Sequence, residues 1–263
     1  MRFDGETPAG DAVERMSQAL TQRGPDGHGS WSRGAIAFGH RRLAVIDLSP
    51  RGDLPLVDTA SGIALVFNGC IYNYRALREE LVAAGHRFAS ESDSEVLLRA
   101  YVAWGEAGIE RLDGMFAFAI RDRDGSLLLG RDRLGIKPLY YRRDDRGLWF
   151  ASDIGALVAA GVVSGDIDAA GLHHYLTFHG IVPAPRTILA DVAKVPPATL
   201  LRFGEDGAAT ERRYWTLRFP DQPADETAVD EAELLSALEQ AVVARLTADV
   251  PVGVLLSGGR DSS

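Results

Sequence analysis

The chain has 263 residues, a formal net charge of −9 and a sequence pI of about 5.2. Such an acidic chain lacks the basic surface that nucleic-acid binding requires, and no apolar run approaches the roughly 18 residues of a membrane-spanning helix. The hydrophobic content of 46% is enough for a sizeable core. A single cysteine, Cys70, excludes an intrachain disulfide. We therefore expect a cytoplasmic protein that binds neither nucleic acid nor a membrane.

The first 110 residues predict helices and short strands in alternation. Helical spacing of apolar residues predicts helices over residues 11–22, 74–84 and 95–104. Apolar runs predict strands over residues 35–39, 43–47 and 63–67. Asn73 is a candidate N-cap for the second helix, and Ser92 with Glu95 has the spacing of a capping box for the third.

The middle of the chain predicts antiparallel hairpins, because Asp-Gly and Arg-Gly turns separate its apolar runs. The expected pairs are residues 115–121 with 126–130, 139–143 with 148–151, and 200–203 with 212–217. Short helices are expected over residues 153–160 and 168–178.

The composition changes near residue 218. Residues 218–229 are polar, contain two prolines and predict a linker. An amphipathic helix over residues 230–248 then leads to an apolar strand over residues 252–256, of the kind found in parallel sheets. Residues 1–217 thus predict an α+β domain of antiparallel sheets with helices, and residues 230–263 the start of an α/β domain. Since one strand cannot form a parallel sheet, we expect the chain to be part of a longer one.

Asn68 and Gly69 follow a predicted buried strand and precede a helix. An Asn side chain beside a Gly backbone N–H can direct two donors at one developing negative charge, as an oxyanion hole does. The alternative is an ordinary Asn-Gly turn.

The segment that ends the chain follows another predicted strand. Glycines there let backbone N–H groups approach a phosphate, serines add donors, and an Asp can reach a metal counter-ion. The alternative is a βα turn without function. The predicted phosphate-binding residues are Ser257, Gly258, Gly259, Asp261 and Ser262.

In this order, the motifs of the chain resemble those of the glutamine-dependent asparagine synthetase family: a class II glutamine amidotransferase domain followed by the start of an ATP-pyrophosphatase-type synthetase domain. The resemblance covers essentially the whole chain. Its motifs are Arg23-Gly24-Pro25-Asp26-Gly27, His40-Arg41-Arg42-Leu43-Ala44-Val45-Ile46-Asp47, Phe67-Asn68-Gly69, Ile71-Tyr72-Asn73, Ser92-Asp93-Ser94-Glu95, Gly114-Met115-Phe116-Ala117-Phe118-Ala119, Gly130-Arg131-Asp132-Arg133-Leu134-Gly135-Ile136-Lys137-Pro138-Leu139-Tyr140 and, at the end of the chain, Ser257-Gly258-Gly259 followed after one residue by Asp261-Ser262.

The resemblance implies an Ntn-type α-β-β-α sandwich that hydrolyses glutamine to glutamate and ammonia. It further implies that ammonia reaches a synthetase domain, where ATP, with Mg²⁺, and aspartate form β-aspartyl-AMP and then asparagine. No metal is implied for the glutaminase domain. Homodimer formation is implied by the resemblance alone.

The resemblance also assigns roles to single residues. Arg42 would pair with the α-carboxylate of glutamine, which suits a bidentate guanidinium, whereas the alternative is a solvated surface arginine. Asp93 would hold the ammonium group, as an alternative to capping a helix. Asn68 and Gly69 would form the oxyanion hole. The predicted glutamine site comprises Arg42, Leu43, Ala44, Val45, Ile46, Asn68, Gly69, Cys70 and Asp93, and the predicted ATP site adds Leu256 to the phosphate-binding residues.

The chain departs from the family pattern in three places. The family begins with Cys-Gly-Ile, whose cysteine is the nucleophile and whose α-amino group is the base, whereas this chain begins with Met1. We therefore expect the opening strand and the nucleophile to be missing, and the chain as given to be inactive. Cys70 stands where the family commonly has Glu; without an N-terminal amine or a nearby base, it is not expected to replace the nucleophile. Arg260, in place of a small or aliphatic residue, is the milder departure.

Two alternatives stay open at this point. A related enzyme could amidate a different carboxylate or close a ring, because the same two domains serve several acceptors. A non-catalytic scaffold that has lost its nucleophile is the other.

Overall fold

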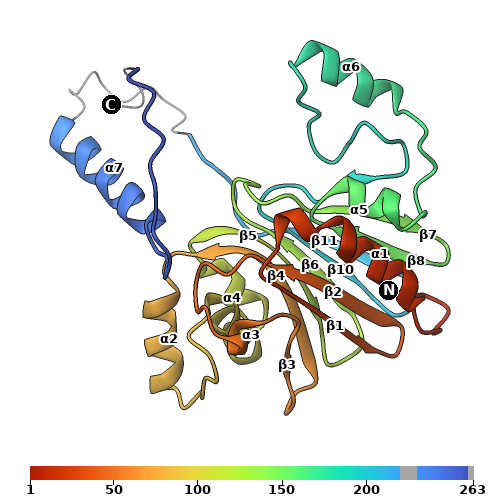
Figure 1. Cartoon of the computed structure of the whole chain (residues 1–263), viewed down its shortest axis with the longest axis horizontal. Helices are drawn as coiled ribbons and strands as arrows, with labels where there is room; N and C mark the ends of the chain where they lie inside the picture. The colour runs from red at the N-terminus through yellow and green to blue at the C-terminus, as the bar shows by residue number, and fades with distance from the viewer. Residues whose placement is uncertain (220–229, 260–263) are drawn as a thin grey trace.

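The computed structural model describes residues 1–219 and 230–259 (Figure 1). Most of the predicted linker, residues 220–229, therefore lies outside the described residues, as do Arg260, Asp261 and Ser262. None of the helices in the described part is long and apolar enough to cross a membrane.

A six-stranded antiparallel sheet forms the centre of the molecule. Its strands are β3 (Leu56–Asp58), β4 (Ile63–Ile71), β5 (Gly114–Arg121), β6 (Leu127–Arg131), β10 (Thr199–Phe203) and β11 (Ala209–Arg213), in the order β11-β10-β6-β5-β4-β3. The pairing of β4 with β5, from Ala64 opposite Arg121 to Ile71 opposite Gly114, is the longest in this sheet.

Two smaller sheets face the six-stranded one. They are the hairpin of β1 (Gly27–Arg33) with β2 (Ile36–Arg42), and a three-stranded sheet of β7 (Tyr140–Asp144), β8 (Gly147–Ala151) and β9 (Ala193–Lys194) in the order β8-β7-β9. Alternate residues of each strand point inward, and a buried apolar cluster fills the space between the layers. It includes Phe38 of β2, Val66 of β4, Ala117 of β5, Leu129 of β6 and Leu148 of β8.

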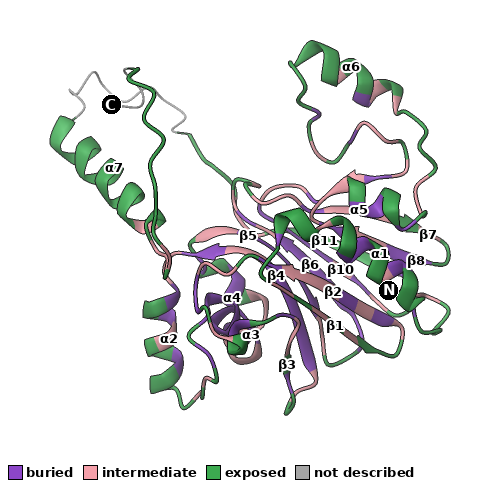
Figure 2. Cartoon of the chain, in the orientation of Figure 1, coloured by how far each residue is buried: buried purple, intermediate pink, exposed green. Residues whose placement is uncertain are grey.

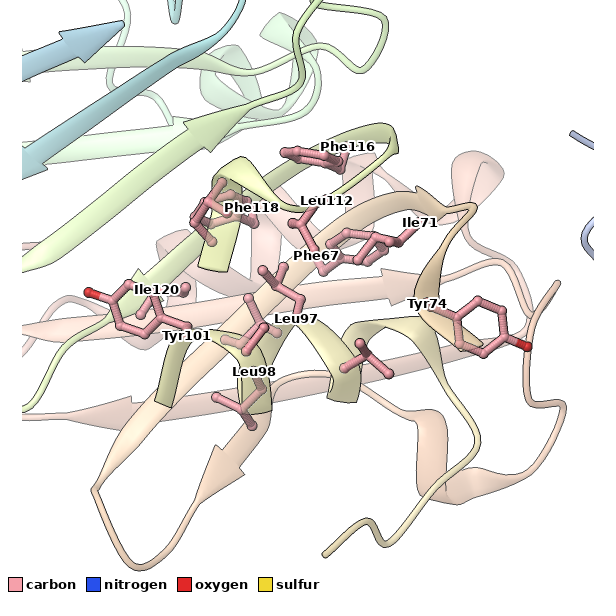
Figure 3. Packing of buried hydrophobic residues seen from close by; sticks show 14 of the residues in the cluster. Phe67, Ile71, Tyr74, Leu97, Leu98, Tyr101, Leu112, Phe116, Phe118 and Ile120 are labelled. Carbon is pink, nitrogen blue, oxygen red and sulfur yellow. The ribbon is translucent and has the colours of Figure 1, made fainter. Parts of the chain in front are cut away.

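Helices cover both outer faces. On the two smaller sheets lie α1 (Gly10–Ala19) and α5 (Ile154–Ala159), and on the larger sheet α2 (Tyr74–Ala83), α3 (Asp93–Trp104) and α4 (Glu106–Glu110). Figure 3 shows Leu97 and Tyr101 of α3 packed against Phe67 and Phe118 of the larger sheet. The layers are thus helix, sheet, sheet, helix, which confirms the predicted α+β sandwich.

The remaining helices contribute little to this core. α6 (Ala169–Thr177) projects from the sheet layers, and α7 (Glu231–Arg245) buries none of its residues (Figure 2). The strand predicted at 252–256 is wrong: these residues are exposed and pair with no strand of the described chain. Their apolar side chains have no neighbouring strand to pair with, and a single β-segment is not stable alone.

A gap separates β2 from β8. Among the described residues β2 pairs along its length only with β1, and β8 only with β7. At one end Met1 and Arg2 bridge the gap: the Met1 α-amino group donates to Leu148 O (2.8 Å), and Arg2 N–H donates to Ala35 O (2.8 Å). Because one stretch of backbone bonds to both sides at once, the two edges are spaced for a single strand between them.

Several predicted elements differ in the structure. Of the two strands expected at 35–39 and 43–47, only the first forms, as part of β2; residues 43–47 form a turn, since they curve around the Arg42 side chain. The polar and exposed strand β1 was not predicted. The last hairpin pairs β10 with β11 and leaves 214–217 outside. Asn73 does not cap α2, because its side chain bonds instead to Arg111 O and Asp113 N–H. The other predicted helices and hairpins are confirmed within a few residues.

Candidate functional site

A cavity of about 530 Å³ opens where the gap between β2 and β8 meets β4 and β5. Its walls come from all three sheets and from α1, which covers it on the outside. Nearly all of the predicted glutamine-binding residues line it, with Ala44 as the exception: Arg42, Leu43, Val45, Ile46, Asn68, Gly69, Cys70 and Asp93. Residues separated by 51 positions in the chain thus meet in one cavity.

Asn68 and Gly69 lie inside β4 and not in a turn. Asn68 points toward the cavity, where its Nδ2 donates to Ser152 Oγ (3.2 Å). Ile71 N–H donates to an Asp93 carboxylate oxygen (2.9 Å) instead of to β5. Because bonding alternates along an antiparallel ladder, Gly69 N–H also points away from β5. The two predicted oxyanion donors are therefore adjacent at the cavity wall.

Gly69 has a second, steric reason to be glycine. A Cβ at this position would lie 2.3 Å from Met115 O and 2.7 Å from the Phe116 Cα of the paired strand. Such contacts are far inside van der Waals distance, so any side chain would push β4 away from β5 and move the donors.

Arg42 is buried at the end of β2, and its guanidinium is enclosed by the turn that follows. Nη1 donates to Ser49 O (2.8 Å) and to Asp53 Oδ1 (2.7 Å), and Nη2 donates to the carbonyl oxygens of Ile46 and Asp47. The Asp53 carboxylate is 48% exposed, so it is the acceptor that an incoming carboxylate could most readily replace. The arrangement excludes a solvated surface arginine.

Asp93 is the first residue of α3, but Ser92 caps that helix by accepting from Glu95 N–H (3.2 Å). The Asp93 side chain is instead turned to β4, where it accepts from Ile71 N–H. Burial raises the pKa of Asp93 to about 6, against the opposing effect of that hydrogen bond and of the Arg42 charge. Asp93 is therefore an anion at neutral pH, in a cavity where a substrate ammonium group would find few other negative charges.

Cys70 points to the same side of β4 as Asn68, since they are two residues apart. Burial, followed by the negative charge of Asp93, raises the pKa of the Cys70 thiol to about 12, although the Lys137 charge acts in the opposite direction. At neutral pH the group is a thiol and not the thiolate that nucleophilic attack requires. This property supports the expectation that Cys70 is not the nucleophile.

Lys137 also lines the cavity, although it is not among the predicted glutamine-binding residues. Its position is set by Asp132, which is completely buried and accepts from the N–H groups of Phe116, Leu134, Ile136 and Lys137. Arg131 donates to three backbone carbonyls of the same region and so holds the loop in place. The only sequence signal for a place of Lys137 at the cavity was its position directly after this tight loop.

The described residues of the predicted ATP site are not enclosed as the cavity residues are. Leu256, Ser257, Gly258 and Gly259 are all exposed, and Asp261 and Ser262 fall outside the described residues. Within residues 1–219 and 230–259, no three His, Cys, Asp or Glu side chains are grouped so that they could hold a metal ion.

Comparisons with known proteins match two segments of this chain. The sequence profile of the glutamine amidotransferase domain matches residues 2–215, and that of asparagine synthase matches residues 233–263. Glutamine-hydrolysing asparagine synthetase 3 of Bacillus subtilis is 38% identical over 257 residues, which are 95% of this chain and 41% of that protein. Synthetase 1 of the same organism is 39% identical over 255 residues, 96% of this chain and 40% of that protein. The chain thus spans about two fifths of these curated relatives.

Among solved structures, the glutamine phosphoribosylpyrophosphate amidotransferase from B. subtilis superposes with a TM-score of 0.61 at 19% identity, over 81% of this chain and 48% of that one. At this identity the likeness shows the fold alone, which is the Ntn-type sandwich of antiparallel sheets. Because the amidotransferase profile covers residues 2–215, the chain belongs to the family of glutamine amidotransferase domains.

Proposed function

We propose that residues 1–217 are the glutaminase domain of a glutamine-dependent asparagine synthetase, and that residues 230–263 begin its synthetase domain. The glutaminase domain hydrolyses glutamine, and the ammonia serves the ATP-dependent amidation of aspartate through β-aspartyl-AMP. The proposal draws support from the names of the relatives and from the match of residues 233–263 to asparagine synthase.

The observation that carries the glutaminase assignment is the set of groups gathered at one cavity. Asp93 offers an anion for the substrate ammonium group, and Arg42 a guanidinium for its carboxylate. The Asn68 amide and the Gly69 N–H offer two donors for the oxygen that becomes negative when the side-chain amide is attacked. A free amino acid with a terminal amide has all three of these features.

The nucleophile in this proposal enters on a strand seated in the gap between β2 and β8. An extended segment there would bond to both open edges, as Met1 and Arg2 do at one end. A cysteine at the start of such a strand would carry its own base, the α-amino group. Atoms of the strand would then occupy part of the cavity and face Asn68.

ATP, with Mg²⁺ as its counter-ion, is proposed to bind at Leu256–Ser262 in the complete synthetase. Gly258 has a positive φ of 73°, which suits a loop that turns its backbone N–H groups toward phosphate. Aspartate, homodimer formation and a cytoplasmic location are parts of the same proposal; the last is supported by the single cysteine, which is not in a disulfide.

The test adds a cysteine nucleophile with a free α-amino group. An extension starting Cys-Gly-Ile and long enough to fill the gap is placed ahead of Met1, and glutamate release from L-glutamine is measured. We expect turnover with the cysteine extension, none with an alanine-first extension of equal length, and a loss of about 100-fold or more when Asn68 is changed to Ala in the active version.

Binding separates the possible failures. If L-glutamine binds in isothermal titration calorimetry but no version turns it over, the nucleophile placement is wrong. If correctly folded protein neither binds nor hydrolyses glutamine, the glutaminase assignment is wrong and the scaffold alternative gains support.

A further inference from the structure

The end of α7 and the residues that follow it contact the amidotransferase domain. Figure 1 shows this end approaching the start of α2. The Arg245 guanidinium lies over the Tyr72 ring, 5.2 Å from its centroid, directly before α2. Four residues on, Asp249 Oδ2 accepts from Asp47 N–H (2.7 Å), and Asp249 N–H donates to Val45 O (2.8 Å). An otherwise exposed segment is thus bonded twice to the turn 43–49.

Asp47 is the residue through which this contact reaches the cavity. Its φ of 53° is in the left-handed region, which is uncommon for residues other than Gly. Its carboxylate accepts from Ser49 N–H, Ser49 Oγ–H and Glu91 N–H (2.8 Å), and its carbonyl accepts from Arg42 Nη2. These bonds outweigh the effect of burial and lower the pKa of Asp47.

Asp47 therefore stands between two groups of the candidate site. On one side its carbonyl and that of Ile46 hold the Arg42 guanidinium. On the other, its carboxylate holds Glu91, two residues before Asp93. The only backbone donor of Asp47 is its N–H, and that donor is used by Asp249. Loss of the acceptor leaves a partly buried N–H unpaired and the left-handed turn without a restraint.

We propose that Asp249 is a positioning residue for the glutamine cavity: its two hydrogen bonds to the turn 43–49 hold Arg42 and the Glu91–Asp93 segment in their binding arrangement. This role rests on the proposed glutaminase function. By thermodynamic reciprocity, occupation of the cavity must also tighten the hold on residues 245–250. The contact thereby links the segment that leads to the predicted ATP loop with the site that supplies ammonia.

The experiment uses the 263-residue chain with three substitutions. Asp249→Ala removes the acceptor, and Asp249→Asn keeps an oxygen for Asp47 N–H while removing the charge. Asp230→Ala is the control, because Asp230 caps α7 through Ala232 and Glu233 and is not one of the described residues that line the cavity. Amide hydrogen exchange is followed in peptides covering 43–49, 89–93 and 245–250, together with the dissociation constant for L-glutamine.

We expect Asp249→Ala to speed exchange in 43–49 and 89–93, leave the β4–β5 pair unchanged, and weaken glutamine binding about fivefold. Asp249→Asn should keep exchange rates and glutamine affinity close to those of the unmodified chain, and Asp230→Ala should change neither of these two properties. Glutamine should slow exchange in 245–250 of the unmodified chain.

Three results would overturn the proposal: unchanged exchange in 43–49 with Asp249→Ala, faster exchange throughout the molecule, or equal effects of Ala and Asn. If the unmodified chain does not bind glutamine, the proposed function fails, and the exchange of 43–49 and 89–93 alone decides whether Asp249 orders the turn.

Discussion

Helices α3 and α7 both carry apolar residues at helical spacing, but α3 is largely buried in the structure and α7 is exposed. α3 buries most of its residues, among them Val96, Leu97 and Ala100, against the six-stranded sheet. α7 carries Leu234, Leu235 and Leu238 on its surface, each more than half exposed. Local spacing of apolar residues is enough to specify a helix, but only a facing layer converts that spacing into stability. The same contrast holds between the residues that line the cavity and the exposed segment 252–259.

The largest expected difference between the two regions concerns core packing. Leu97→Ala should lower the free energy of unfolding by about 2–5 kcal/mol, because Leu97 is fully buried in α3. The matched Leu238→Ala in α7, where the side chain is 55% exposed, should change it by less than about 0.5 kcal/mol. Urea unfolding followed by circular dichroism measures both. Equal losses would show that α7 packs in solution.

A glycine pair sharpens the same comparison. Gly69→Ala should lower the free energy of unfolding by about 1–3 kcal/mol, since its Cβ would press on Met115 O. Gly253→Ala, where a Cβ would meet nothing within 4 Å, should be neutral within about 0.5 kcal/mol. The same urea titration applies. A neutral Gly69→Ala would mean that β4 and β5 are less closely paired than the structure has them.

The pH dependence of glutamine binding tests the enclosed site through Asp93. With a pKa of about 6, the binding-competent anion should rise about tenfold in population between pH 5 and pH 7, and the affinity for glutamine with it. Asp93→Asn should bind weakly and lose this dependence. Calorimetric titration across the range is the measurement, and a flat profile in the unmodified chain would place the ammonium elsewhere.

As the pH rises and the affinity for glutamine increases, the contribution of Asp93 to the free energy of unfolding should decrease. The pKa of Asp93 is raised from 3.8 to about 6 on folding, so its protonated form favours the folded state. That contribution is complete below about pH 3.8 and is lost as the pH rises through 6. Asp93→Asn should therefore be more stable than the unmodified chain at pH 7, by urea unfolding, and nearly equal to it at pH 3.5. The negative charge proposed to hold the ammonium group would thus lower the stability of the fold at neutral pH.

The smallest expected effect is that of Cys70→Glu. A carboxylate on the cavity side of β4, close to Asp93 and Lys137, should add a second anion for the ammonium group and lower the dissociation constant of glutamine about threefold. Cys70→Ser is the control of similar size without charge. Weaker binding by the Glu variant would mean that repulsion from Asp93 outweighs the attraction.

Much of the fold could be predicted because its signals are local. Turn dipeptides between apolar runs located the hairpins β5–β6 and β7–β8, and Ser92 with Glu95 located the start of α3. The site residues Arg42, Asn68, Gly69 and Asp93 could be selected from motifs, and they line one cavity. Their individual roles in catalysis are proposals.

The errors share a cause, which is that a distant partner decides the local conformation. Residues 43–47 have the composition of a strand, but the Arg42 guanidinium draws the carbonyls of Ile46 and Asp47 around itself. The same cause excludes the turn that was the alternative for Asn68 and Gly69, because pairing with β5 keeps both residues extended. Residues 252–256 have the pattern of a buried strand, but no described strand lies beside them.

By itself the sequence determined the order of helices and hairpins and the set of polar residues available for chemistry, because periodicity, caps and turn residues act over a few positions. Only the tertiary structure decided that Asp93 is turned from its helix toward β4, that a gap one strand wide separates β2 from β8, and that Asp249 bonds to Asp47 across 202 positions of the chain. Burial and hydrogen bonding between distant segments set these features, and such contacts leave no local pattern.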